Sequence, residues 1–145
     1  MKKVELKSKK IYGLTIRTNN EKEMNPETAQ IGALWGEYFS KVLPTLPESI
    51  KGYGVYSNYE SDAFGDFDVM AGAEIENEEL ATVTLQEGTY LSFKAEGELP
   101  QAVIDTWGEI WNYFADENCS EIRVFKTDFE LYLSESEAEV YIGIV

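Results

Sequence analysis

The sequence has no histidine and a single cysteine among its 145 residues. The absence of histidine removes the commonest general base and the commonest metal ligand of proteins. With Cys119 alone no internal disulfide bond can form, which is typical of proteins from reducing compartments. Cys119 also follows Asp116, Glu117 and Asn118, and neighbouring carboxylates disfavour the thiolate form that a nucleophile needs. We therefore expect no metal site, no cofactor and no cysteine-based catalysis.

Positive charge is the second scarce feature. Twelve lysines and arginines stand against 27 aspartates and glutamates, and the formal net charge is −15 at pH 7. Phosphate binding requires a basic surface, so we expect no direct nucleic-acid partner. An acidic protein instead attracts cationic partners from a distance. Long apolar runs are missing too, and Met1-Lys2-Lys3 leads into Val4-Glu5 rather than into an apolar secretion signal. The sequence therefore predicts a cytoplasmic protein that does not cross a membrane.

Aromatic side chains, by contrast, are abundant, with three Trp, nine Tyr and seven Phe. A hydrophobic content of 43% is that of a globular core, and the length suits one domain, residues 1–145. The aromatic residues exceed what a core of this size needs. Their number favours an aromatic-lined cavity.

Apolar periodicity predicts strands and two helices. Asn25-Pro26 is typical of a helix start. A buried stripe then follows before Pro44, made of Ile31, Leu34, Trp35, Tyr38, Phe39, Val42 and Leu43. Leu99-Pro100 opens the second helix, whose stripe contains Trp107 and Trp111. The expected strands are 2–18 with a turn or bulge at 7–10, 51–60, 67–74, 81–95 with a bend at 87–88, 121–133 and 138–144.

The element order occurs twice along the chain. Trp35-Gly36-Glu37 in the first helix is echoed by Trp107-Gly108-Glu109 in the second, and the prolines at 26 and 100 keep nearly the same offset. We infer an α+β fold of duplicated β-α-β-β units, approximately 1–76 and 80–145. Such units would form one antiparallel sheet with two main helices against one face and a central groove between them.

The stretch from Lys126 to Tyr132 alternates as a strand does. Asp128, Glu130 and Tyr132 then share one face, and Phe129 lies on the other. A carboxylate held rigidly beside aromatic rings is what a pocket for a cation needs. The alternative is the solvent face of an edge strand, where charges are ordinary.

Several motifs together resemble the gyrase-inhibitor-like, or effector-binding, domain family. They are Tyr56…Tyr59-Glu60, Gly65-Asp66-Phe67-Asp68 with Gly72 before Glu74, the Trp107…Ile110-Trp111 helix and the Asp128–Tyr132 strand. Domains of this family are the ligand-sensing half of multidrug-responsive transcription activators of the AraC and MerR types. They also occur alone, and the sequence is similar in particular to a stand-alone member carried on an integron gene cassette.

The resemblance implies a central cavity for lipophilic cations, in which a buried glutamate on a late strand pairs with the ligand's charge. Glu130 matches that glutamate by its place in the strand. Aromatic residues are expected around it, although core packing is the alternative for each tryptophan. By alternation Tyr53 and Tyr59 lie on the face opposite to Tyr56, and which face lines the groove is left open. The candidate ligand-binding residues are Glu130, Trp107, Trp111, Tyr56, Tyr132, Trp35 and Tyr90.

Three functions fit these features. The first is a sensor or sequestering protein for lipophilic, mainly cationic, drug-like compounds, without a DNA-binding domain of its own because strand residues begin at the first positions. The second is a hydrolase in which Glu130 activates water and Tyr56 or Tyr132 donates a proton. Without histidine or metal motifs we favour a protein that is not an enzyme. The third is a gyrase-inhibitor-like interaction with a protein partner related to transcription or to gyrase.

Overall fold

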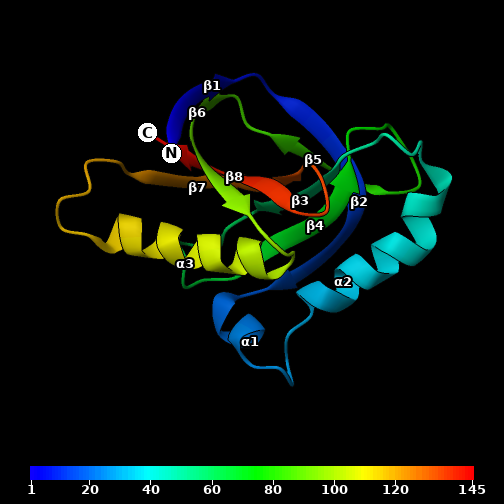
Figure 1. Ribbon diagram of the computed structural model, residues 1–145, viewed down its shortest axis with the longest axis horizontal. Helices are drawn as coiled ribbons and strands as arrows, with labels where there is room; N and C mark the ends of the chain where they lie inside the picture. The colour runs from blue at the N-terminus through cyan, green and yellow to red at the C-terminus, as the bar shows by residue number, and fades with distance from the viewer.

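The computed structural model describes residues 1–145 as one eight-stranded antiparallel sheet with helices packed on it (Figure 1). The α+β fold class with a single antiparallel sheet is therefore confirmed. The strands are β1 Lys2–Leu6, β2 Lys9–Thr18, β3 Gly52–Ser57, β4 Phe67–Ala73, β5 Ala81–Leu85, β6 Gly88–Glu96, β7 Arg123–Tyr132 and β8 Glu137–Ile144. The helices are α1 Asn20–Met24, α2 Ile31–Glu37 and α3 Gln101–Ala115, with a π-helical turn η1 Tyr38–Val42 and a 3-10 turn η2 Leu43–Thr45.

The strand order is β1-β6-β8-β7-β3-β4-β2-β5. If β1 to β4 exchange their places with β5 to β8, strand by strand, the order is the same when read from the opposite edge of the sheet. The first strand of each half pairs with the second strand of the other half, β1 with β6 and β5 with β2. The bends expected near residues 7 and 87 separate these strands, so 2–18 and 81–95 each form two. A duplicated chain would give this order, and the duplication itself stays a prediction.

The first main helix begins later than predicted. Asn25 ends α1 and its side chain accepts a hydrogen bond from the backbone N–H of Glu27, so Pro26 lies in a turn and not at a helix start. The carboxylate of Glu23 instead accepts hydrogen bonds from the N–H groups of Gln30 and Ile31, at 3.0 Å each. Because the first N–H groups of a helix lack partners within it, this side chain defines where α2 begins.

The second half of that helix is irregular. Leu34, Tyr38 and Val42 are buried, as the predicted stripe requires. The wider π-helical turn η1 follows α2, and in it Phe39 is 55% exposed, while Leu43 directly after it is 38% exposed. The prediction that these two side chains are buried in the stripe is therefore wrong. Helix α3 follows Pro100 as predicted, and no helix of the protein is long and apolar enough to span a membrane.

Apolar side chains are buried on both faces of the sheet. Under α2 and η1 lies a cluster with Leu34, Tyr38 and Val69, and under α3 lie smaller clusters around Val103 and Ile110. The other face carries a separate cluster, which contains Ile11, Tyr53, Val55, Met70, Leu85, Tyr90 and Phe129. The helices thus cover one face on either side of the central strands β7 and β3 (Figure 1).

Strands β2 and β4 approach too closely for side chains at one paired position. Gly13 and Gly72 face each other there, and a Cβ atom on Gly13 would collide with the carbonyl oxygen of Ala71. A Cβ atom on Gly72 would lie 2.5 Å from the carbonyl oxygen of Tyr12. The obstacle is backbone in both cases, so it cannot rotate away as a side chain would.

Gly13→Ala is expected to lower the free energy of unfolding by about 1–3 kcal/mol, because the added methyl group overpacks the sheet. Thermal denaturation followed by circular dichroism measures the change. The matched control is Gly36→Ala in α2, where an added Cβ atom meets nothing within 4 Å. That change should leave stability equal or raise it by up to about 1 kcal/mol. Equal melting temperatures for the two variants would contradict the expectation.

Candidate functional site

Glu130 lies at the centre of the sheet. It belongs to β7, which is hydrogen-bonded to β3 on one side and to β8 on the other, and its side chain is only 3% exposed. Glu130 therefore lies neither on an edge strand nor at a solvated position. A buried carboxylate is costly unless other groups take the place of water.

Three neutral donors take that place. The Tyr56 hydroxyl and the Trp107 indole N–H each donate to Oε2 of Glu130 at 2.7 Å, and the Tyr132 hydroxyl donates to Oε1 at 2.7 Å. None of the ion pairs in the structure includes Glu130. Its negative charge is thus solvated by dipoles and has no positive counterpart within the protein.

Burial dominates the titration of this cluster. It raises the pKa of Glu130 above the ordinary value of 4.5, although the hydrogen bonds from Tyr132, Tyr56 and Trp107 act in the opposite direction. Burial and the nearby Glu130 carboxylate also raise the pKa of Tyr56 and of Tyr132. The two phenols therefore keep their protons at neutral pH and remain donors.

The walls around Glu130 come from both halves of the chain. Trp35 of α2 packs edge-on against Tyr132, with ring centroids 5.2 Å apart, and Trp107 of α3 packs edge-on against Tyr56 at the same distance. Opposite Glu130 on β3 stands Gly54, where a Cβ atom would lie 2.6 Å from Oε1 of Glu130 and 3.3 Å from the Trp35 ring. Only a glycine leaves room there for both side chains.

Glu130, its three donors and Trp35 line a groove of about 1320 Å³ between α2 and α3. Its outer parts include exposed apolar side chains of both helical segments, namely Phe39, Leu43, Ile104 and Trp111. Six of the seven candidate residues line this groove: Glu130, Trp107, Trp111, Tyr56, Tyr132 and Trp35. No group of three or more acidic or cysteine side chains is arranged to hold a metal ion.

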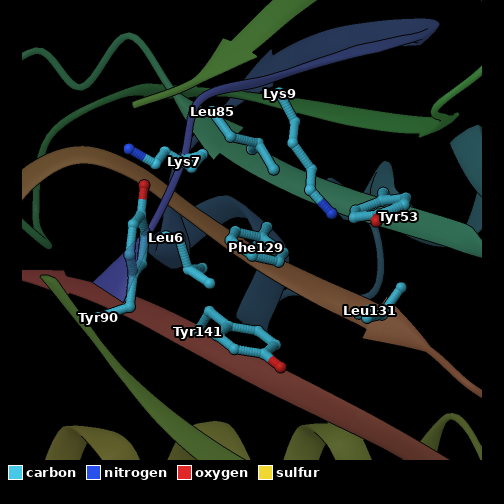
Figure 2. A pocket seen from close by; sticks show the side chains of 9 residues that line it. All are labelled: Leu6, Lys7, Lys9, Tyr53, Leu85, Tyr90, Phe129, Leu131 and Tyr141. Atoms are coloured by element: carbon cyan, nitrogen blue, oxygen red, sulfur yellow. The ribbon is translucent and has the colours of Figure 1, made fainter. Parts of the chain in front are cut away.

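Tyr90 does not line the groove. Figure 2 shows it on the other face of the sheet, at a small pocket of about 70 Å³ that also contains Tyr141 and Phe129. Its hydroxyl donates to the backbone oxygen of Gln86 and shares a hydrogen bond with Thr127. Tyr90 is on β6 and Glu130 on β7, and strand β8 lies between them. Alternation within one strand therefore could not predict whether these two side chains lie on the same face of the sheet.

Tyr59 lines the groove although alternation predicts the opposite face from Tyr56. Strand β3 ends at Ser57, and Asn58 adopts a left-handed backbone conformation with φ of 52°. The chain therefore reverses its alternation after the strand, and Tyr59 returns to the side of Tyr56. Asparagine is among the residues that adopt this conformation most readily, which was the signal in the sequence.

A buried ion pair beside the groove was not predicted. Asp128 is fully buried and accepts hydrogen bonds from the Arg123 guanidinium at 2.7 Å, from the Gly143 N–H at 2.8 Å and from the Tyr59 hydroxyl. The expected strand 121–133 contains a bulge between Arg123 and Asp128, which brings the two side chains together. The alternation of the strand predicted that Asp128 shares a face with Glu130, but it did not predict which groups bind Asp128.

Comparisons with known proteins show the family of this chain and its fold. The family model described as "integron-associated effector binding protein" (Cass2) matches residues 4–144. A Vibrio cholerae integron cassette protein of known crystal structure shares 40% identity, with a TM-score of 0.94 over 99% of this chain and 95% of its own. No curated protein sequence matches significantly.

Two further structures share the fold at 17% identity. A putative transcription regulation protein from Staphylococcus aureus MU50 has a TM-score of 0.79 over 99% of this chain and 96% of its own. The protein SAV2435, solved with bound tetraphenylphosphonium, has a TM-score of 0.76 over 99% of this chain and 93% of its own.

Glu130→Gln is expected to raise the free energy of unfolding at neutral pH. The variant loses a buried charge, and the amide can still hydrogen-bond with Tyr56, Trp107 and Tyr132. In the folded protein the pKa of Glu130 lies above 4.5, its ordinary value in the unfolded chain. As pH falls from the folded-state pKa to the ordinary value, the buried carboxylate takes up a proton and the wild type gains stability. The advantage of the variant should therefore shrink over that pH range.

Urea denaturation of wild type and variant at a series of pH values measures the difference. A variant that is less stable at pH 7, or whose advantage stays constant down to pH 4, would show that the charge of Glu130 carries no desolvation cost.

Proposed function

The chain belongs to the family of integron-associated effector binding proteins, and on that premise we propose that its groove binds lipophilic cations by means of Glu130. The observation that carries the proposal is a buried carboxylate, held by three neutral donors, with no basic side chain to neutralise it. A cation entering the groove would provide the missing positive charge. The protein would then serve as a sensor of such compounds or sequester them.

The three donors prepare Glu130 for this role. They orient the carboxylate before a ligand arrives and partly offset the rise in its pKa that burial causes, so binding requires little reorganisation of the protein. An ion pair separated by 4 Å is stabilised by about 4 kcal/mol at an effective dielectric constant near 20. The same pair in bulk water gains about a quarter of that. Burial thus makes charge the main source of selectivity.

The aromatic walls suit the rest of such a ligand. A cation over the face of a tryptophan or tyrosine ring gains about 0.5–2 kcal/mol, and a flat or globular apolar body can pack against the rings. The exposed apolar side chains Phe39, Leu43 and Ile104 would be covered by a large ligand. A net charge of −15 adds long-range attraction for cations and repulsion for anions.

SAV2435 supports the ligand class. It has the same fold as this chain and was solved with the lipophilic cation tetraphenylphosphonium. The groove of the present chain, about 1320 Å³, is large enough for a molecule of that kind.

The hydrolase hypothesis gains no specific support. Tyr56 and Tyr132 do contact Glu130, but both hydroxyls donate to the carboxylate itself. A protein partner and a cytoplasmic location stay predictions from the sequence.

Tetraphenylphosphonium is expected to bind wild type saturably, and Glu130→Gln should weaken binding by about tenfold to several hundredfold, because the loss of a buried charge partner costs about 2 kcal/mol or more. Isothermal titration calorimetry measures both constants. Tetraphenylborate, of the same shape and opposite charge, should not bind. The control is Glu96→Gln, which removes an exposed carboxylate whose partner is Lys94 and should leave affinity unchanged.

Binding of tetraphenylborate, or equal affinities of Glu130→Gln and wild type for the cation, would show that the groove does not select by charge. Absence of binding by any lipophilic cation would overturn the proposed function.

The affinity for tetraphenylphosphonium is also expected to fall as pH decreases. This ligand does not titrate, so the change reports the protein, and the pKa of Glu130 is raised by burial. Protonation below that pKa removes the charge that attracts the cation, and affinity is full above it. The same titrations repeated between pH 7 and pH 4 should show this loss in wild type and a much smaller one in Glu130→Gln. Parallel pH profiles would contradict the assignment.

A further inference from the structure

We propose that the groove recognises a second chemical feature of its ligands, a neutral carbonyl acceptor such as an ester or an amide, through Arg123. The inference rests on the proposed function, since it concerns the same groove. It narrows the ligand class to lipophilic cations that also carry such a carbonyl group.

Arg123 reaches the groove because of the irregularity in β7. The register shifts between Arg123 and Asp128, and Phe125 within this segment has a positive φ of 54°. The guanidinium consequently lies over the Phe125 ring, at 4.4 Å from its centroid, and contacts Asp128. The side chain is only 7% exposed and is part of the groove lining.

Most of the donors of this guanidinium are unused. Arginine carries five N–H bonds, and the structure gives Arg123 one hydrogen bond, from Nη2 to Asp128. Its Nε atom is buried and has no acceptor at all. Buried donors without partners are costly, and few native side chains leave them so. The Nη1 group also has no acceptor within the protein and, unlike Nε, is not closed off from solvent, so an acceptor on a ligand in the groove can bind it.

The electrostatics favour a neutral acceptor over a carboxylate. The charge of Arg123 is already balanced by Asp128, which is fully buried and 2.7 Å away. A ligand carboxylate at this place would be repelled by Asp128, by Glu130 and by the overall charge of −15. A carbonyl oxygen accepts the same hydrogen bond without that repulsion.

The distance along β7 between Glu130 and Asp128 determines how far apart the cation and the carbonyl group of a ligand must lie. Asp128 and Glu130 are alternate residues on one face of β7, about 7 Å apart along the strand. Tyr56 donates to Glu130 and Tyr59 donates to Asp128, and both rings contact Phe67. The wall between the two sites is therefore continuous and aromatic, and the cation and the carbonyl group should be separated by about 7 Å or more.

Three xanthene dyes test this. Rhodamine 6G is a cation with an ethyl ester, rhodamine 19 is the corresponding free acid, and pyronin Y is a related cation without the ester-bearing ring. Dissociation constants come from fluorescence anisotropy. Wild type should bind rhodamine 6G at least about tenfold more tightly than pyronin Y, the effect of one hydrogen bond to a charged group. Rhodamine 19 should bind more weakly than rhodamine 6G.

The decisive quantity is the ratio of the pyronin Y constant to the rhodamine 6G constant. In Arg123→Met this ratio should fall about tenfold, because only the ester loses a partner. Arg17→Met is the matched control. It removes the only other arginine, which is paired with Asp68 outside the groove, and should leave the ratio unchanged.

Arg123→Met leaves Asp128 buried without its cation, so the double variant Arg123→Met with Asp128→Asn is measured beside it, and both are checked by circular dichroism. A ratio that stays at the wild-type value in a folded variant would overturn the inference and show that Arg123 only balances Asp128. If neither variant folds, equal wild-type affinities for rhodamine 6G and pyronin Y would overturn it. Failure of all three dyes to bind wild type would count against the proposed function itself.

Discussion

One buried carboxylate constrains the rest of the site. Glu130 is ionisable, nearly inaccessible to water and unpaired with any base, so its charge is stabilised only by the hydroxyls of Tyr56 and Tyr132 and the indole of Trp107. Each of these side chains must be held by another part of the fold, and Gly54 must lack a side chain for the carboxylate to fit. A site of this kind stores a desolvation cost that a cationic ligand can relieve, which is a common relation between stability and binding.

The sheet order provides the supports. Strands β7 and β3 are adjacent in the middle of the sheet, so Glu130 and Tyr56 come from different halves of the chain and still meet. Helices α2 and α3 lie on the same face and contribute Trp35 and Trp107 from opposite sides of the groove. The symmetric order thus places Glu130 on a central strand, and the groove lies between α2 and α3, which Figure 1 shows on either side of the central strands.

Local chemistry explains which predictions from the sequence were accurate. The alternation of the Asp128–Tyr132 strand, the helix after Pro100 and the bends near residues 7 and 87 all depend on neighbours in the chain, and the structure contains them. The start at Asn25-Pro26 was wrong because a carboxylate from the preceding helix, Glu23, binds the first N–H groups of α2. The π-helical turn that exposes Phe39 likewise has no signature in the apolar periodicity.

By itself the sequence determined the fold class, the set of strands and the fact that Asp128, Glu130 and Tyr132 share a face, because side-chain alternation is a property of the strand backbone. Only the tertiary structure decided that this face is buried beneath two helices, that Tyr90 lies on the other one and that Asn58 returns Tyr59 to the groove. It also decided that Arg123 folds back onto Asp128. These outcomes depend on pairing between strands distant in the sequence, whose free energy comes from packing and burial that no local pattern contains.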